Sequence, residues 1–294
     1  MNGLLVAGGL MAVLGLGLSS VLALANKRLH VYEDPRIDEV DDLLPQANCG
    51  ACGFPGCRAF AEALVKGAAS PAQCTVNSAE AVAEIAALLG IEAGTRQKRV
   101  ARVACAGGNH VARDIARYRG IETCRAAALV SGGGKGCPWG CLGFGDCAPA
   151  CPFDAITMDA HDLPVVDEDK CTACGECVVV CPKDLFSLQD DAHRLWVACS
   201  NRQLGKEARA HCDVACIGCS RCVKDAAEGL IYMEDNLAVV DYSKNEGASL
   251  DAIQGCPTGA IVWLDKDKGV IKGAKAQRSE AEAGASKEGR TESG

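Results

Sequence analysis

The chain has 294 residues, of which 49% are hydrophobic, 23% are charged and only 4% are aromatic, and its formal net charge is −8. This acidic balance, without a basic stripe, argues against a nucleic-acid partner, and the hydrophobic content argues against a chain that is disordered throughout. Twenty cysteines in so long a chain do not fit a small disulfide-stapled secreted domain. We therefore expect the cysteines to bind metal, and their spacing has to indicate which metal.

The N-terminal segment is predicted to cross a membrane. Residues 4–25 contain no charged side chain, and a helix of this length spans a hydrocarbon core of about 30 Å. Lys27 and Arg28 follow the apolar run and no basic residue precedes it, which is the reverse of a cleaved signal peptide. The positive-inside rule then puts the C-terminal side in the cytoplasm. We interpret residues 1–26 as a transmembrane anchor and residues 27–44 as a polar connector.

Small residues recur along one face of this predicted helix, at spacings of three and four. They are Gly8, Ala12, Gly15, Ser19 and Ala23. Such a face lets transmembrane helices approach closely. A helix rich in Gly, Ala and Leu also produces this pattern by chance, so both interpretations stay open.

Composition divides most of the remaining chain into segments. A small cysteine-containing domain at residues 45–90 is predicted to have helices at 59–66 and 79–89, from its apolar spacing. A linker region at 91–123 begins with a basic run. Residues 265–294 are rich in Lys, Glu, Gly, Ala and Ser without an apolar period, and we expect them to be disordered.

The region in between contains an internal repeat. A shift of 75 residues superimposes five cysteines and one Cys-Pro pair. The matched pairs are Cys124 with Cys199, Cys137 with Cys212, Cys141 with Cys216, Cys147 with Cys222, and Cys181-Pro182 with Cys256-Pro257. We expect two tandem ferredoxin-like units, at residues 124–198 and 199–264.

The first unit contains the cysteine run of a bacterial ferredoxin. In the run Cys171-x2-Cys174-x2-Cys177-x3-Cys181-Pro182, three closely spaced thiolates hold one cubane and the fourth ligates its neighbour. A zinc ribbon needs two Cys-x2-Cys pairs and has no use for a third close cysteine or for the Cys-Pro. The run predicts one [4Fe–4S] cluster on Cys151, Cys171, Cys174 and Cys177, and another on Cys137, Cys141, Cys147 and Cys181.

Two further sites follow from similar spacing. The small domain carries Cys49-x2-Cys52-x4-Cys57-x16-Cys74 among glycines, and we favour iron–sulfur over zinc there as well. The second repeat has a complete ferredoxin run and its own Cys-Pro, which predicts a cluster on Cys216, Cys219, Cys222 and Cys256. Its partner cluster is lost, because the repeat shift maps Cys151, Cys171, Cys174 and Cys177 onto Ala226, Glu246, Ser249 and Ala252.

These assignments give four clusters and leave four cysteines over. The remaining ones are Cys105, Cys124, Cys199 and Cys212. They are either buried or free thiols or the ligands of a fifth cluster, and both interpretations stay open. No catalytic constellation, flavin site or nicotinamide site accompanies them.

The order of anchor, four-cysteine domain and ferredoxin array resembles the B subunit of the Rnf electron transport complex in its long form. The phrases at residues 44–57 and 140–147 carry the resemblance, which covers about residues 1–264. That family implies an α+β fold, with a single transmembrane helix, a small helical [4Fe–4S] domain and tandem ferredoxin-like domains. The degenerate second repeat departs from the family's long form and leaves the cluster total open.

The resemblance also implies a function. The family's complex is a ferredoxin:NAD⁺ oxidoreductase of the inner membrane that couples electron transfer to sodium or proton translocation. This chain would then be a redox subunit that takes electrons from soluble ferredoxin, while flavins and the NAD site belong to other subunits. A similar redox subunit of another membrane oxidoreductase stays within the same class. A membrane-tethered zinc scaffold is the alternative from a different class, and visible absorption that bleaches on reduction distinguishes the two.

Overall fold

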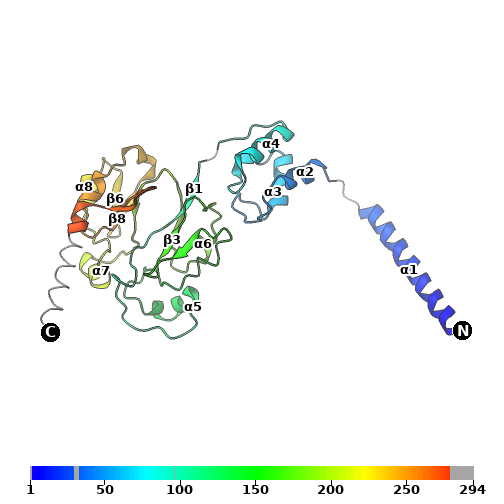
Figure 1. Cartoon of the computed structure of the whole chain (residues 1–294), viewed down its shortest axis with the longest axis horizontal. Coiled ribbons are helices and arrows are strands. Elements are labelled where there is room, and N and C mark those ends of the chain that lie inside the picture. The colour runs from blue at the N-terminus through cyan, green and yellow to red at the C-terminus, as the bar shows by residue number, and fades with distance from the viewer. Residues whose placement is uncertain (1, 30–32, 96, 279–294) are drawn as a thin grey trace. The chain divides into compact units, whose positions relative to one another are not determined.

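The computed structural model describes residues 2–29, 33–95 and 97–278. Helices and short strands are mixed along the chain (Figure 1), which confirms the α+β expectation. The chain divides into two compact units. The first comprises Met1–Asn48, Phe54–Pro71 and Asn77–Gly94, and the second comprises Cys49–Gly53, Ala72–Val76 and Thr95–Gly294.

The N-terminal helix α1 runs over Asn2–Leu29. Its part Val6–Leu29 is long and apolar enough to cross a membrane, with a mean hydropathy of 2.0 and no residue buried by the protein itself. Lys27 and Arg28 lie in the last turn, where cations complement the helix dipole. By length and composition, α1 therefore fits the predicted anchor.

Three helices build the rest of the first unit, namely α2 (Arg36–Asp42), α3 (Cys57–Val65) and α4 (Ala79–Leu89). The predicted helices at 59–66 and 79–89 correspond to α3 and α4 and are confirmed. Helix α4 begins where Ser78 accepts the N–H of Ala81 and ends at Gly90, whose φ of 65° is the left-handed conformation that favours glycine. A short 3₁₀ turn, η1, lies at Pro71–Gln73.

The predicted connector at 27–44 is only partly a connector. Its first residues belong to α1, residues 30–32 lie outside the described part, and α2 packs against α3. Helix α2 buries Ile37 and Val40, which lie three residues apart and therefore on one helical face. These two apolar side chains outweigh the polar composition of the segment.

The second unit consists of short antiparallel strands joined by small helices. Its sheets are β1 (Arg99–Val103) with β4 (Phe186–Asp190), β2 (Ile156–Met158) with β3 (Pro164–Val166), β6 (Ile231–Glu234) with β7 (Leu237–Val240), and β5 (Leu195–Val197) with β8 (Ile261–Asp265) and β9 (Gly269–Lys272). Its helices are α5 (Cys124–Leu129), α6 (Glu176–Val180), α7 (Gly205–His211), α8 (Arg221–Asp225) and α9 (Asp251–Gln254), with 3₁₀ segments η2 (Ser131–Gly134) and η3 (Tyr242–Gly247).

The internal repeat is visible in this order of elements. Strand β2, helix α6 and strand β4 begin 75 residues before β6, α9 and β8, respectively. Each repeat thus forms a hairpin, a short helix and a further strand around its own apolar core. Phe186 in the first repeat and Ile261 in the second, both at the start of the matched strands, are buried.

Two strands pair across the segment boundaries that we predicted. Strand β1, inside the predicted linker region 91–123, pairs with β4 of the first repeat, whereas β5, before the boundary at 199, pairs with β8 of the second. Nε1 of Trp196 on β5 donates to the carbonyl oxygen of Val103 on β1 over 3.0 Å. This hydrogen bond links the flanking strands of the two repeats, which belong to one compact unit.

The predicted disorder from residue 265 is wrong for the first part of that segment. Strand β9 pairs with β8 across a turn in which Oδ1 of Asp265 accepts the N–H groups of Asp267 and Lys268. Valine and isoleucine at 270 and 271 give β9 enough strand propensity despite its lysine-rich surroundings. Residues 279–294 of the predicted tail lie outside the described residues.

Candidate metal centres

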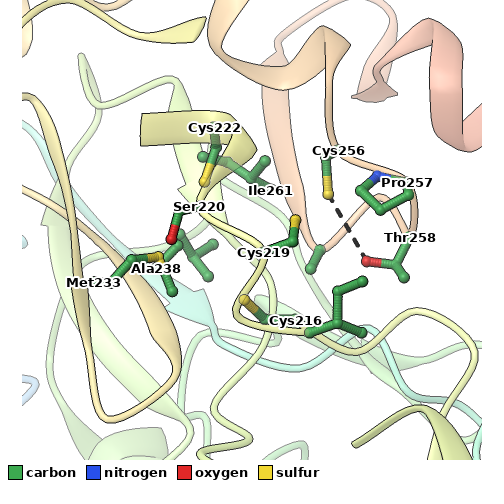
Figure 2. A pocket seen from close by; sticks show the side chains of 13 residues that line it. Cys216, Cys219, Ser220, Cys222, Met233, Ala238, Cys256, Pro257, Thr258 and Ile261 are labelled. Atoms are coloured by element: carbon green, nitrogen blue, oxygen red, sulfur yellow. Dashed lines mark hydrogen bonds between the residues drawn. The ribbon is translucent and has the colours of Figure 1, made fainter. Parts of the chain in front are cut away.

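Four cysteines of the second repeat surround one cavity of about 350 Å³ (Figure 2). Cys216 and Cys219 come from a loop, Cys222 from α8, and Cys256 from the turn that follows α9. Burial and then the charges of the other three thiols raise the pKa of Cys222 to about 12. The structure thus brings together the four cysteines that the ferredoxin run predicts.

The loop that presents Cys219 has an unusual backbone. Gly218 and Ser220 on either side of it both have positive φ, 65° and 55°. The same pattern surrounds Cys174, where Ala173 and Gly175 have φ of 58° and 89°. Non-glycine residues in this region carry backbone strain. Both loops have positive φ on either side of the middle cysteine. We infer that the backbone must turn tightly there to point three thiols toward one site.

The predicted set Cys151, Cys171, Cys174 and Cys177 is also brought together. Burial, followed by the charges of the three other thiols, raises the pKa of Cys177 to about 12. The N–H of Ala101 on β1 approaches Sγ of Cys171 at 3.3 Å. A strand from the predicted linker region thus supplies a donor to this group of thiols.

The second set of the first repeat differs from the predicted one. A cavity of about 390 Å³ is lined by Cys124, Cys141, Cys147 and Cys181. Burial and then Cys124 raise the pKa of Cys147 to about 11, with a smaller effect from Cys181. Cys137, which the spacing placed in this set, does not line this cavity, so the structure does not bring the predicted set together.

The difference has a local cause at Phe144. Phe144 occupies the place that corresponds to Cys219 in the second repeat, and its neighbours Gly143 and Gly145 have the same positive φ, 81° and 77°. The first repeat therefore keeps the loop but lacks the middle thiol. Cys124, the first residue of α5, brings a thiol to the cavity from another element. Alignment of Cys219 with Phe144 was the signal in the sequence that could have revealed this substitution.

A third cavity, of about 340 Å³, gathers four other cysteines. These are Cys105, Cys137, Cys199 and Cys212. Burial, with smaller contributions from neighbouring thiols, raises the pKa of Cys199 to about 12 and that of Cys212 to about 11. Three of the four cysteines left over by the spacing line this cavity, but Cys124 lies at the cavity described above and Cys137 takes its place.

One cysteine of the small-domain motif is placed by a helix of the first unit. Cys57 is the first residue of α3. Oδ1 of Asn48 accepts the N–H of Cys57 over 2.9 Å, which fixes the start of α3. The four-thiolate site on this motif stays a prediction from the sequence.

The donor geometry indicates which kind of metal these thiols suit. Within the described ranges, no three Cys, His, Asp or Glu side chains converge closely enough to hold one metal ion. Four thiolates on a single zinc, at about 2.3 Å each, would lie only about 3.8 Å apart. Here sets of four thiols instead line shared cavities with mostly apolar walls. That arrangement fits a cubane of iron and sulfide, which needs thiolate ligands around its outside.

Comparison with known families supports iron–sulfur chemistry. The Fe-S cluster family model matches residues 44–76, which contain the motif of the small domain, and the 4Fe-4S dicluster domain model matches residues 139–188. The second match spans the ferredoxin run and the loop around Phe144. The two matches support clusters of the 4Fe-4S type in this chain.

Most of the chain is similar in sequence to the B subunits of several membrane redox complexes. The chain is 44% identical to that subunit of the Na⁺-translocating ferredoxin:NAD⁺ oxidoreductase complex of Acetobacterium woodii, over 89% of this chain and 78% of that protein. It is 40% identical to its counterpart in the proton-translocating complex of Clostridium ljungdahlii, over 95% and 96%. It is 38% identical to its counterpart in the ion-translocating oxidoreductase complex of Methanosarcina acetivorans, over 85% and 95%. The chain therefore belongs to the B-subunit family of the ion-translocating oxidoreductase, or Rnf, complexes.

Proposed function

We propose that this chain takes electrons from reduced soluble ferredoxin and relays them toward the flavin- and NAD-binding subunits of an Rnf complex. In that role it is a subunit of a ferredoxin:NAD⁺ oxidoreductase of the translocase class and has no complete active site of its own. The observation that carries the proposal is the succession of cavities in the second unit, each lined by four cysteine thiols.

The proposed ligands of four clusters follow from the geometry and the spacing. They are Cys49, Cys52, Cys57 and Cys74; Cys151, Cys171, Cys174 and Cys177; Cys124, Cys141, Cys147 and Cys181; and Cys216, Cys219, Cys222 and Cys256. A bound [4Fe–4S] cluster supplies one-electron chemistry. The protein's own contribution is to exclude water with apolar walls and to aim N–H groups at the sulfurs, which sets the reduction potential.

The apolar helix α1 supports a location of this relay at the membrane. Helix α1 exposes large apolar side chains outside its small-residue face, and Lys27 and Arg28 stand at its C-terminal end. We propose that α1 spans the inner membrane and that both units lie in the cytoplasm, where soluble ferredoxin is found. Other subunits of the complex would then contact both the helix and the cluster-binding units.

The experiment that tests the proposal uses the complex purified with its membrane subunits. Cys174→Ala should remove one cluster, about four iron atoms, and stop ferredoxin-dependent NAD⁺ reduction while the chain stays in the membrane fraction. Val179→Ala is the matched control, because Val179 lies on α6 beside the same loop but is 80% exposed. Normal turnover in Cys174→Ala, or zinc in place of iron in the wild-type chain, would overturn the proposal.

A further inference from the structure

We infer that the cavity lined by Cys105, Cys137, Cys199 and Cys212 binds a fifth [4Fe–4S] cluster, and that this cluster connects the two ferredoxin-like repeats. The inference rests on the proposed iron–sulfur chemistry but concerns a site that the two matched family models do not cover as a set. The four thiols come from four separate segments, which directly follow β1, η2, β5 and α7.

The N–H groups around this cavity indicate a ligand with negative charge on sulfur. Sγ of Cys105 is approached at 3.4 Å by the N–H of Gly107 and by that of Cys141. Sγ of Cys199 accepts from the N–H of Asn201 at 3.4 Å and from that of Cys216 at 3.3 Å. A neutral thiol is a weak acceptor, so two donors on each of these sulfurs suit thiolates that hold a cluster.

Two side chains add to this environment. Asn201 is only 1% exposed, and its Nδ2 lies 3.4 Å from Sγ of Cys137. Lys135 lines the same cavity, and its positive charge would offset that of a cluster with four thiolates. Otherwise the lining includes alanines and Val214, which keep water away. A set of structural thiols that only fill a core would need neither the buried amide nor the lysine.

The position of the cavity indicates what the cluster would do. The donor to Cys105 is the backbone of Cys141, whose thiol lines the first-repeat cavity, and the donor to Cys199 is the backbone of Cys216, whose thiol lines the second-repeat cavity. One hydrogen bond therefore joins this site to the neighbouring site on each side. An electron that leaves a reduced cluster in one repeat could pass through this site to an oxidised cluster in the other.

The repeat explains why the thiols are available. Cys199 and Cys212 correspond to Cys124 and Cys137 under the 75-residue shift. The second repeat keeps its middle thiol, Cys219, and so does not need Cys199 for its own cluster. With this set, all twenty cysteines fall into five groups of four.

Paired substitutions test the ligand set. Removing two ligands of the same cluster loses the iron of one cluster, whereas removing one ligand from each of two clusters loses the iron of both. The measurement is iron and acid-labile sulfide in the full chain, reconstituted without oxygen. Cys199→Ala should lose about four irons. Cys137→Ala with Cys199→Ala should lose about four as well, whereas Cys124→Ala with Cys199→Ala should lose about eight. The reverse pattern would overturn this grouping in favour of the one predicted from spacing.

Native mass spectrometry of the unmodified chain supplies a count that depends on no substitution. A mass that corresponds to five clusters, about 20 irons, supports the inference. Four clusters and no loss in Cys199→Ala would overturn it and leave the proposed function intact. A chain with zinc and no iron would contradict the proposed function itself, so the two failures are distinguishable.

Discussion

The backbone N–H of Cys216 donates a hydrogen bond to Sγ of Cys199 across 3.3 Å. The two cysteines line different cavities, so this contact links the walls of two proposed cluster sites. Clusters bound at both sites would be close enough for their unpaired spins to interact. In the proposed relay, an electron would enter the second repeat across this contact.

Magnetic coupling checks this relationship. We expect the fully reduced protein to give a broadened electron paramagnetic resonance spectrum, because neighbouring reduced clusters interact. Cys199→Ala should sharpen the component that Cys219→Ala removes, since the second-repeat cluster then loses a neighbour. An identical line shape for that component in wild type and Cys199→Ala would show that no cluster lies beside it.

Asn201 is predicted to raise the reduction potential of the cluster on Cys137. Its Nδ2 donor, buried beside the sulfur, stabilises the extra negative charge of the reduced state. Loss of a hydrogen bond of about 1 kcal/mol corresponds to roughly 40 mV for one electron. Asn201→Ala should therefore lower one midpoint potential by about that amount in a redox titration and leave the iron content unchanged.

Gln203 offers the control for that measurement. Its side-chain oxygen lies 3.4 Å from the same Nδ2 of Asn201, but the side chain that contacts Cys137 is that of the asparagine. Gln203→Ala should leave the midpoint potential close to the wild-type value. Equal shifts in both variants would mean that general disturbance of this loop, and not the donor, sets the potential.

The small-residue face of α1 is predicted to pack against membrane subunits. Gly15 lies on that face, and apart from the adjacent residues and the local helix backbone no atom of the described residues lies within 4 Å of a Cβ added there. Gly15→Leu should therefore not disturb the isolated chain, but it should weaken co-purification with the membrane subunits by adding bulk at a close crossing. Gly17→Leu, about 200° further around the helix, is the matched control. Unchanged assembly in Gly15→Leu would show that this face contacts lipid.

A buried ion pair is predicted to stabilise the second unit. Arg102 on β1, only 6% exposed, is hydrogen-bonded through its guanidinium to Glu168, and Arg194 lies 3.7 Å from the same carboxylate. Glu168→Ala leaves the buried Arg102 without its partner, which should cost about 3 kcal/mol or more of unfolding free energy. Asp169→Ala removes an adjacent, fully solvated carboxylate and should cost little. Similar thermal unfolding of the two variants would contradict this role of the pair.

The sequence predicts the local parts of this molecule well, because local spacing determines them. The helices α3 and α4, the apolar α1 and the loop that gathers Cys216, Cys219 and Cys222 all depend on residues close in the chain. The site lined by Cys105 and Cys199 depends on β1 and β5. These strands pair with β4 and β8, respectively, across the predicted segment boundaries. A periodic pattern in the sequence does not encode such long-range pairing. The leftover cysteines could therefore be counted from the sequence but not assigned to particular sites.

Phe144 provides the sharpest test of how the repeat diverged. It occupies the loop position of Cys219, between two glycines with the same positive φ, while Cys124 supplies the thiol from α5. Cys124→Ala should therefore lose about four irons. Phe144→Cys added to Cys124→Ala should restore them, because the loop already has the backbone that turns a middle cysteine toward the cluster.

The control for this rescue removes the aromatic ring without adding a thiol. Phe144→Ser in the Cys124→Ala background also loses the edge-on contact between Phe144 and Tyr118, whose ring centroids lie 5.6 Å apart, at a cost of about 1 kcal/mol. It should recover no iron, since a serine oxygen is a harder ligand than the sulfur that these clusters favour. Recovery of iron and sulfide only in the cysteine variant would establish Phe144 as the position of the missing middle ligand, and failure to recover it there would mean that Cys124 does not substitute for that thiol.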